Sequence, residues 1–355
     1  MILSPETTLT VDIEDKLEQL WNLVGNTPML QVFYTDHGQT RSIYVKCEHY
    51  NLTGSMKDRM ALHILHEAYR EGNIRPGDRI VEATSGCTGI AFSAIGRALG
   101  HPVTIIMPAG VSQERIAIIQ SLGADVVLVS KDEGGFIAAL QRGEEMAASD
   151  PCIFLPHQFA NKYNADAHRL TTGKEIWLQL QSVDTTPDAF VAGVGTGGTV
   201  MGVGSYLKTR KRDIRIHPLE AAESPTLSTG YKTGSHRIQG FFDEFVPEIL
   251  KLDELDHVVQ ANDGDAIIVA QKLALQLGVA VGISSGANII GAIKLQREMG
   301  PEARVVTVLC DSNKKYLSTD LVRQEPVKAG YIAPDIEFTK YRSISRLSIS
   351  LSNEL

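Results

Sequence analysis

The sequence predicts an α/β fold made of two doubly wound domains with mainly parallel sheets. From residue 43 onward, short β-branched runs alternate with longer segments of helical periodicity, which is typical of strand–helix–strand units. Several strand segments are apolar throughout, as expected where helices cover both faces of a sheet. The chain of 355 residues also exceeds the size of one ordinary hydrophobic core, which indicates two domains.

The local patterns place each element in turn. The expected strands are residues 43–48, 79–83, 103–107, 125–130, 189–194, 214–218, 279–281 and 305–309. The expected helices are residues 59–71, 89–99, 113–122, 136–148, 170–181, 199–208, 266–277 and 287–298. A domain change is expected near residues 150–160, where prolines interrupt the pattern. The Ser-rich stretch from Lys340 onward is expected to be a frayed helix or a disordered end.

The composition argues against nucleic-acid-binding and membrane-associated classes of protein. The 34 basic and 42 acidic residues give a net charge of −8, which argues against nucleic-acid or anionic-membrane partners. The four cysteines form no CxxC or metal-ligand spacing, so reduced thiols are expected. His63 and His66 share a helical face, but scattered histidines are more common than a metal pair. The first 20 residues do not resemble a signal peptide, and no apolar run spans a membrane; a soluble, cytoplasmic protein is expected.

Small residues follow three of the expected strands. The segments are TSGCTG after residues 79–83, GTGG after 189–194 and ISSGA after 279–281. Because ligands of parallel sheets bind outside the carboxyl ends of the strands, these three turns predict one shared pocket.

The turn at residues 194–199 is the richest in glycine. Glycines between a strand and a helix let backbone N–H groups approach a phosphate, although a tight turn alone also uses glycine. Gly193, Gly195 and Gly198 also match the dinucleotide-binding GxGxxG pattern, with Glu220 where a ribose ligand would lie. That pattern is weak evidence alone, and it lies here in the middle of the chain.

Two further segments carry chemical groups. Lys57 lies at an expected helix start, where the helix dipole disfavours a purely structural lysine; the position suits a Schiff-base amine, although an exposed surface lysine is the alternative. Residues 84–88 gather hydroxyl groups and backbone donors at another helix start, which suits a carboxylate; one N-cap residue is the structural alternative.

Taken together, these segments resemble the cysteine synthase (O-acetylserine sulfhydrylase) and cystathionine β-synthase family, whose members have pyridoxal phosphate (PLP) enzyme fold type II. The resemblance runs from the motif VGNTP at residues 24–28 to Tyr316–Thr319, with five motifs in order. It implies a smaller, mobile domain at residues 47–158 that carries the substrate loop. A larger domain at residues 1–46 plus 159–340 would hold the cofactor phosphate, with a tail at 341–355.

The resemblance also implies residue roles. Lys57 would be the catalytic Schiff-base lysine, and Ser284 would face the pyridine nitrogen of PLP. The phosphate cradle would be Gly195, Thr196, Gly197, Gly198 and Thr199. The substrate carboxylate would contact Thr84, Ser85, Gly86, Thr88 and Gln158, with Gly240 in the wall of the amino-acid pocket.

The implied activity is PLP-dependent β-replacement. An activated serine, O-acetylserine or O-phosphoserine, would react with sulfide or a related nucleophile to give cysteine or an analogue. A homodimer is expected from the family, while a complex with a serine acetyltransferase is left open. The alternatives are a weakly active regulatory or binding homologue, a serine/threonine dehydratase and, last, an NAD-dependent oxidoreductase.

Two departures from the family pattern bear on substrate choice. Cys87 stands where the family motif TSGNTG has an asparagine that contacts the cofactor, and a thiol is a weaker hydrogen-bond partner than an amide. The segment Phe241-Phe242-Asp243-Glu244 replaces small residues, so it is expected to change the donor or the nucleophile accepted. Arg237 could balance a phosphate-bearing donor.

Overall fold

The computed structural model describes residues 5–348, and the chain divides into two compact units. Unit 1 contains the residues up to Gly25, Asn51–Thr53 and Lys57–His157; unit 2 contains Asn26–Tyr50, Gly54–Met56 and the chain from Gln158 onward. The chain therefore crosses between the units several times around residues 50–57, immediately before Lys57.

Unit 1 is built on a four-stranded sheet in the order β5-β4-β3-β6, in which all neighbours are parallel. The strands are β3 (Arg79–Ala83), β4 (Val103–Pro108), β5 (Asp125–Val129) and β6 (Ile153–Phe154). The helices are α1 (Pro5–Trp21), α2 (Lys57–Glu71), α3 (Cys87–Leu99), α4 (Gln113–Ser121) and α5 (Gly135–Ser149).

Helices cover both faces of the unit 1 sheet. Val81 and Ala83 of β3 pack in one cluster with Ala139 of α5. Ile80 points to the other face, where it lies against Gly96 of α3. This alternation has the period of two expected of a strand buried on both sides.

Unit 2 contains a seven-stranded sheet in the order β11-β1-β2-β10-β7-β8-β9. The strands are β1 (Met29–Asp36), β2 (Gln39–Cys47), β7 (Ala189–Gly193), β8 (Arg215–Ala221), β9 (Val259–Ala261), β10 (Val305–Leu309) and β11 (Ile336–Ile344). The five strands from β2 to β9 are parallel, and β1 runs antiparallel to both β2 and β11.

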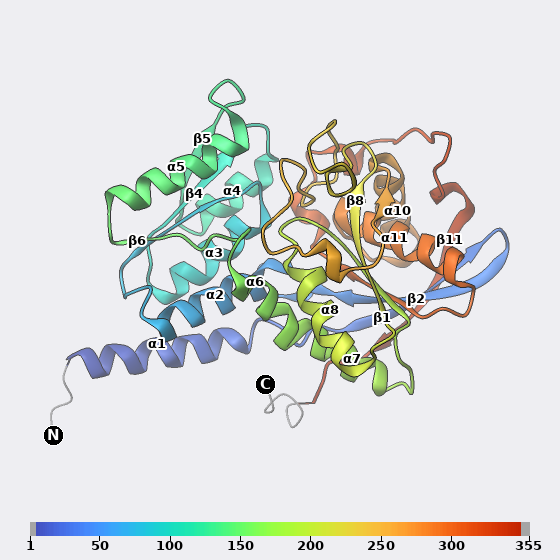
Figure 1. Ribbon diagram of the computed structural model, residues 1–355, viewed down its shortest axis with the longest axis horizontal. Helices are drawn as coiled ribbons and strands as arrows, with labels where there is room; N and C mark the ends of the chain where they lie inside the picture. The colour runs from blue at the N-terminus through green and yellow to red at the C-terminus, as the bar shows by residue number, and fades with distance from the viewer. Residues whose placement is uncertain (1–4, 349–355) are drawn as a thin grey trace. The chain divides into compact units, whose positions relative to one another are not determined.

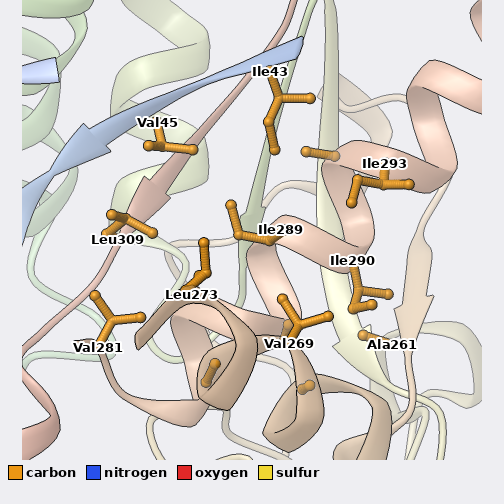
Figure 2. Packing of buried hydrophobic residues seen from close by; sticks show 14 of the residues in the cluster. Ile43, Val45, Ala261, Val269, Leu273, Val281, Ile289, Ile290, Ile293 and Leu309 are labelled. Atoms are coloured by element: carbon orange, nitrogen blue, oxygen red, sulfur yellow. The ribbon is translucent and has the colours of Figure 1, made fainter. Parts of the chain in front are cut away.

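The unit 2 sheet is also covered on both faces. The helices are α6 (Lys162–Ala167), a π-helix (His168–Gly173), α7 (Lys174–Gln181), α8 (Gly198–Arg210), α9 (Thr226–Thr229), α10 (Asp263–Leu277) and α11 (Ile283–Met299). Val191 packs in one cluster with α10 and α11, whereas Phe190 packs in another with α7 and α8. Figure 2 shows the first cluster, in which Val269, Leu273 and Ile289 face Ile43 and Val45. The α10–α11 pair is drawn in orange tones in Figure 1.

The α/β class with two doubly wound, mainly parallel sheets is confirmed, with differences at the sheet edges. Residues 279–281 form no strand; Val281 makes only an isolated bridge to Ser312. The strands β1, β6, β9 and β11 and the helix α1 were not expected from the sequence. Residues 336–344 are a strand rather than a frayed helix, because β11 pairs with β1 along its whole length. The rest of the expected tail, from residue 349, lies outside the described residues.

The division into units differs from the expected domain boundaries. Residues up to Gly25 belong to unit 1 rather than to the larger domain, because α1 packs on α2 and α3. Residues 47–50 and 54–56 belong to unit 2, because they continue from β2 and contact the segment after β10. Within residues 5–348, no helix combines the length and apolarity needed to cross a membrane.

Candidate active site

The glycine-rich turn follows β7 and leads directly into α8. Gly197 is the N-cap of α8, with a φ of 85° that favours glycine. Thr196 and Thr199 beside it are buried, and Asn164 donates a 2.8 Å hydrogen bond to Thr196 Oγ1. The turn thus combines a helix N-terminus with two fixed hydroxyl groups, a donor set that suits a phosphate.

Gly195, Gly240 and Ser284 lie together in unit 2. A Cβ atom on Gly195 would come 2.4 Å from the Gly240 carbonyl oxygen, so only glycine allows this approach. On its other side, a Cβ atom on Gly240 would lie 3.8 Å from Ser284 Oγ. The structure therefore brings together three residues that are far apart in the sequence and that the family resemblance assigned to the cofactor and the amino-acid pocket.

Gln158 lies beside the same turn. Its side chain is buried, and its carbonyl oxygen accepts a 2.8 Å hydrogen bond from Asn164 Nδ2, the amide that also binds Thr196. All the unit 2 residues predicted for the site thus lie around the end of β7 and the start of α8 and α11.

The segment before Lys57 is held by residues that follow β10. Met56 N donates to the Cys310 carbonyl at 3.0 Å, and Ser55 forms a bridge with Asp311. The Gly54 carbonyl accepts hydrogen bonds from Lys315 Nζ at 2.9 Å and from Ser312 N at 3.2 Å. Because Lys57 follows Met56 directly, these contacts fix the point from which the lysine side chain extends.

Lys57 itself is the first residue of α2. The preceding turn is closed by Asp58, whose carboxylate accepts from Thr53 N at 2.7 Å and from Thr53 Oγ1 at 2.5 Å. The helix behind it is buried along Met60–Leu65. The lysine thus starts from a rigid element, as a nucleophilic amine requires.

Residues 84–88 form the turn between β3 and α3 in unit 1. Thr84 Oγ1 accepts from Gly86 N at 3.1 Å, and Arg115 of α4 donates to the Ser85 carbonyl at 3.0 Å. A Cβ atom on Gly86 would lie 2.8 Å from Arg115 Nε, so the guanidinium packs directly under the turn. Ser85 is exposed and Cys87 begins α3. A buried positive charge beneath a helix N-terminus favours an anion there.

Arg237 does not offer its charge to a donor phosphate. It binds the carboxylates of Asp263, Asp320 and Glu325 at 2.7–3.1 Å, and hydrogen bonds from Glu325 first and Asp263 next raise its pKa. The expectation that Arg237 balances a phosphate-bearing donor is therefore wrong, since three carboxylates already surround it.

The segment that departs from the family pattern is packed against the glycine turn. Phe242 N donates to the Val194 carbonyl at 3.0 Å, and a Cβ atom on Gly193 would overlap the Phe241 ring. The rings of Phe159, Phe242 and Phe245 form an aromatic cluster with centroids 4.5–5.4 Å apart. This segment is thus a wall of aromatic side chains where the family pattern has small residues.

Asp243 in this segment lies among titratable groups. Lys232 Nζ lies 3.3 Å and His236 Nε2 lies 3.8 Å from the Asp243 carboxylate. Burial lowers the pKa of His236, while Asp243 opposes that shift. The carboxylate is therefore held in place beside the aromatic wall.

The dinucleotide-binding interpretation fails at Glu220. Its carboxylate is buried and accepts from Leu227 N at 2.8 Å, Ser228 N at 3.2 Å and Gln260 Nε2 at 3.0 Å. These contacts occupy the oxygens that a ribose would need. Glu220 therefore organises the turn at α9.

Four residues beside the predicted groups were not found from the sequence: Asn164, Arg115, Lys315 and Asn288. Each is buried, and each hydrogen-bonds to a predicted residue or segment at least 30 residues away along the chain; Asn164 also contacts Gln158 nearby. Nothing in their local sequence marks them, because an isolated Asn, Arg or Lys in a helix or turn reads as a surface residue.

The residues present fit a phosphorylated cofactor. Unit 2 supplies a helix N-terminus with buried threonines for a phosphate and a buried neutral hydroxyl, Ser284, for a ring nitrogen. Unit 1 supplies the amine of Lys57 and the turn at residues 84–88. Taken separately, the unit 2 residues suit a phosphate and a ring nitrogen, and the unit 1 turn suits a carboxylate.

Known proteins are similar to this chain over most of its length. A family model described as pyridoxal-phosphate dependent enzyme matches residues 20–311. A cysteine synthase from Staphylococcus aureus is 38% identical over 305 residues, which cover 86% of this chain and 97% of that protein.

Solved structures of related enzymes are also similar to this chain. A hydrogen sulfide-producing enzyme from Fusobacterium nucleatum superimposes with a TM-score of 0.91 at 52% identity, covering 94% of this chain and 99% of that one. The cysteine synthase of Entamoeba histolytica gives a TM-score of 0.79 at 32% identity, covering 89% and 94%.

Proposed function

Because the chain belongs to the pyridoxal-phosphate dependent enzyme family, we propose that it catalyses β-replacement on a serine-type amino acid. The observation that carries the proposal is the convergence of Gly195, Gly240 and the neutral Ser284 in unit 2. The S. aureus cysteine synthase, at 38% identity, supports the same reaction class.

The residues of this chain would divide the work. Gly195–Thr199 would hold the phosphate at the start of α8, and Ser284 would bind the ring nitrogen without a charge. When bound, pyridoxal phosphate withdraws electrons from Cα of the substrate and stabilises negative charge there. Thr84, Ser85, Gly86, Thr88 and Gln158 would hold the substrate carboxylate, which orients the Cα–H bond.

Lys57 Nζ would remove the Cα proton as general base. A carboxylate at position 284 would keep the ring nitrogen protonated and favour long-lived charge at Cα. The neutral hydroxyl of Ser284 disfavours long-lived negative charge at Cα and so favours prompt loss of the leaving group on Cβ. A nucleophile then adds at Cβ, and Lys57 returns the proton to Cα.

A second version of the reaction is favoured by one comparison. The F. nucleatum structure, at 52% identity, is described as a hydrogen sulfide-producing enzyme. Here the leaving group would be the sulfide of cysteine, and another nucleophile would take its place. The aromatic wall and Asp243, which replace small residues of the family pattern, are where such a change in donor would arise.

Product analysis tests the proposal and separates its versions. The purified protein with PLP is offered O-acetylserine, O-phosphoserine or cysteine, and then sulfide, homocysteine or no added nucleophile. Cysteine from O-acetylserine plus sulfide supports synthesis, and sulfide from cysteine together with a new β-substituted amino acid supports the second version. Pyruvate alone would identify a dehydratase instead. Unchanged cofactor absorbance with every donor would indicate a regulatory or binding homologue.

The proposal also includes a homodimeric assembly and a cytoplasmic location. We expect a homodimer from the family resemblance, and sedimentation equilibrium would measure it. None of the four cysteines, all within the described residues, forms a disulfide, which suits the reducing cytoplasm.

A further inference from the structure

Asn288 lies on α11 one helical turn after Ser284, with its side chain fully buried. Its Oδ1 accepts a 2.8 Å hydrogen bond from Gly193 N. Its Nδ2 donates to the Val308 carbonyl at 2.8 Å and to Cys310 Sγ at 3.2 Å. One acceptor and both donors of the amide are thus used, and their partners belong to the ends of two different strands.

Each partner leads to a segment assigned above to the cofactor. Gly193 ends β7 and lies two residues before Gly195, the start of the phosphate turn. Cys310 follows β10, and its carbonyl oxygen holds Met56, the neighbour of Lys57. Cys310 N also donates to Ser285 Oγ at 2.9 Å, next to Ser284. A single side chain therefore joins the segments that carry the phosphate turn, the ring-nitrogen group and the lysine.

Packing alone does not account for an amide at this position. The neighbouring residues Ala287, Ile289 and Ile290 are fully buried and apolar. Burying an amide in this fully buried part of α11 is unfavourable unless its hydrogen bonds are made, and an apolar residue would have no such requirement. The amide supplies directional contacts to two strand ends that an apolar side chain cannot supply.

We infer that Asn288 is a positioning residue that fixes the phosphate turn and the Met56–Lys57 segment relative to Ser284. The inference rests on the cofactor positions in the proposed function. Loss of the Asn288 side chain lets β7 and β10 shift along α11. The residues that hold the phosphate, the ring nitrogen and the lysine then no longer match one rigid cofactor.

Gln296 provides a matched control on the same helix. It is also buried, and its amide makes three hydrogen bonds: from Tyr34 OH, to the Ser42 carbonyl at 2.9 Å and to the Ala303 carbonyl at 2.7 Å. None of these partners lies in a segment assigned to the cofactor. Asn288→Ala and Gln296→Ala therefore remove equal numbers of buried hydrogen bonds from the two ends of one helix.

The test compares these two variants with the unchanged protein after removal and re-addition of PLP. The readouts are the PLP dissociation constant, the ³¹P chemical shift of the bound phosphate and the urea midpoint of the protein without PLP. Both variants should lose stability to a similar degree. Asn288→Ala should weaken PLP binding by about tenfold or more, as the loss of a buried hydrogen bond predicts, and should shift the ³¹P resonance. Gln296→Ala should leave both readouts unchanged.

Equal PLP affinity and equal ³¹P shifts in the two variants would overturn the inference. If Asn288→Ala does not fold, Asn288→Ser, which places a smaller polar hydroxyl group there, is measured against Gln296→Ser by the same criteria. If the unchanged protein binds PLP but catalyses no β-replacement, the proposed function is wrong. The comparison of PLP affinity between the two variants still tests the role of Asn288. A protein that is active while both variants bind PLP equally would end only the Asn288 inference.

Discussion

The two ends of the parallel strands in unit 2 carry different chemistry. At the amino ends, Asp188 before β7 binds Arg304 before β10 at 2.9 Å and Lys211 at 2.8 Å. At the carboxyl ends, β7 leads to the glycine turn and β10 leads to Cys310 and the segment that holds Met56. Ion pairs thus tie the strands together at one end, while the glycine turn and the segment that leads to Lys57 lie at the other.

Unit 1 repeats this difference on its own sheet. Arg79 and Asp125, the first residues of β3 and β5, form a 3.0 Å ion pair at the amino ends. The turn at residues 84–88 follows the carboxyl end of β3. In each sheet, ion pairs therefore lie at the amino ends of the strands, and we propose that ligands bind at the carboxyl ends.

The largest expected effect is that of Lys57→Ala. Loss of the Schiff-base amine and general base should lower β-replacement by about 10²–10⁴-fold or more and remove the visible band of the bound cofactor. Stability without PLP should change by less than about 0.5 kcal/mol. Lys211→Ala, a lysine at the amino ends, is the control and should keep the band; a band retained by Lys57→Ala would contradict the assignment.

Gly195→Ala should have the next largest effect. Its new Cβ would lie 2.4 Å from the Gly240 carbonyl oxygen, so the backbone must move and the free energy of unfolding should fall by about 1–3 kcal/mol. PLP affinity, followed by fluorescence titration, should fall with it. Gly143→Ala on α5, where the nearest atom is 3.7 Å away, should change neither quantity much. Normal PLP affinity in Gly195→Ala would contradict the assignment of this turn to the cofactor phosphate.

Asp188→Asn should affect stability without affecting the reaction. Burial raises the pKa of Asp188, but hydrogen bonds from Arg304 and Lys211 outweigh it and lower the pKa to about 2. In the unfolded chain the pKa of this carboxyl group is about 3.9, so the ionised Asp188 stabilises the folded state above that pH. This contribution, about 1 kcal/mol, is lost as the pH falls toward 2.

Urea titrations at several pH values measure this effect. The stability difference between the original protein and Asp188→Asn should be full at pH 7 and should shrink between pH 4 and pH 2 by linkage. Turnover at pH 7 should be unchanged. A large loss of turnover would show that the amino ends also serve the reaction.

Cys87→Asn should have the smallest effect. An amide binds more strongly than a thiol, so we expect a few-fold change in PLP affinity or turnover, with a shift in the cofactor absorbance. Cys152→Asn makes the same chemical change at an exposed position just before the amino end of β6. Equal, negligible effects in both variants would show that Cys87 does not touch the cofactor.

The sequence by itself determined the interior of the fold and the motif residues. Apolar strands with helical segments between them predicted β3, β4, β7 and β10 closely, because burial on both faces leaves a local signature. The glycine turn after β7 and Ser284 at the start of α11 were also visible, because the short motifs that contain them are local in the sequence.

Only the tertiary structure decided what depends on contacts between distant segments. The edge strand β11 and its neighbour β1 were missed, since partly exposed strands have a weaker apolar pattern. Arg237 proved to bind three carboxylates, two of which lie more than 80 residues along the chain. Asn288 was invisible for the same reason: its partners Gly193 and Val308 meet it only in the folded sheet, where hydrogen bonds are set by distance in space.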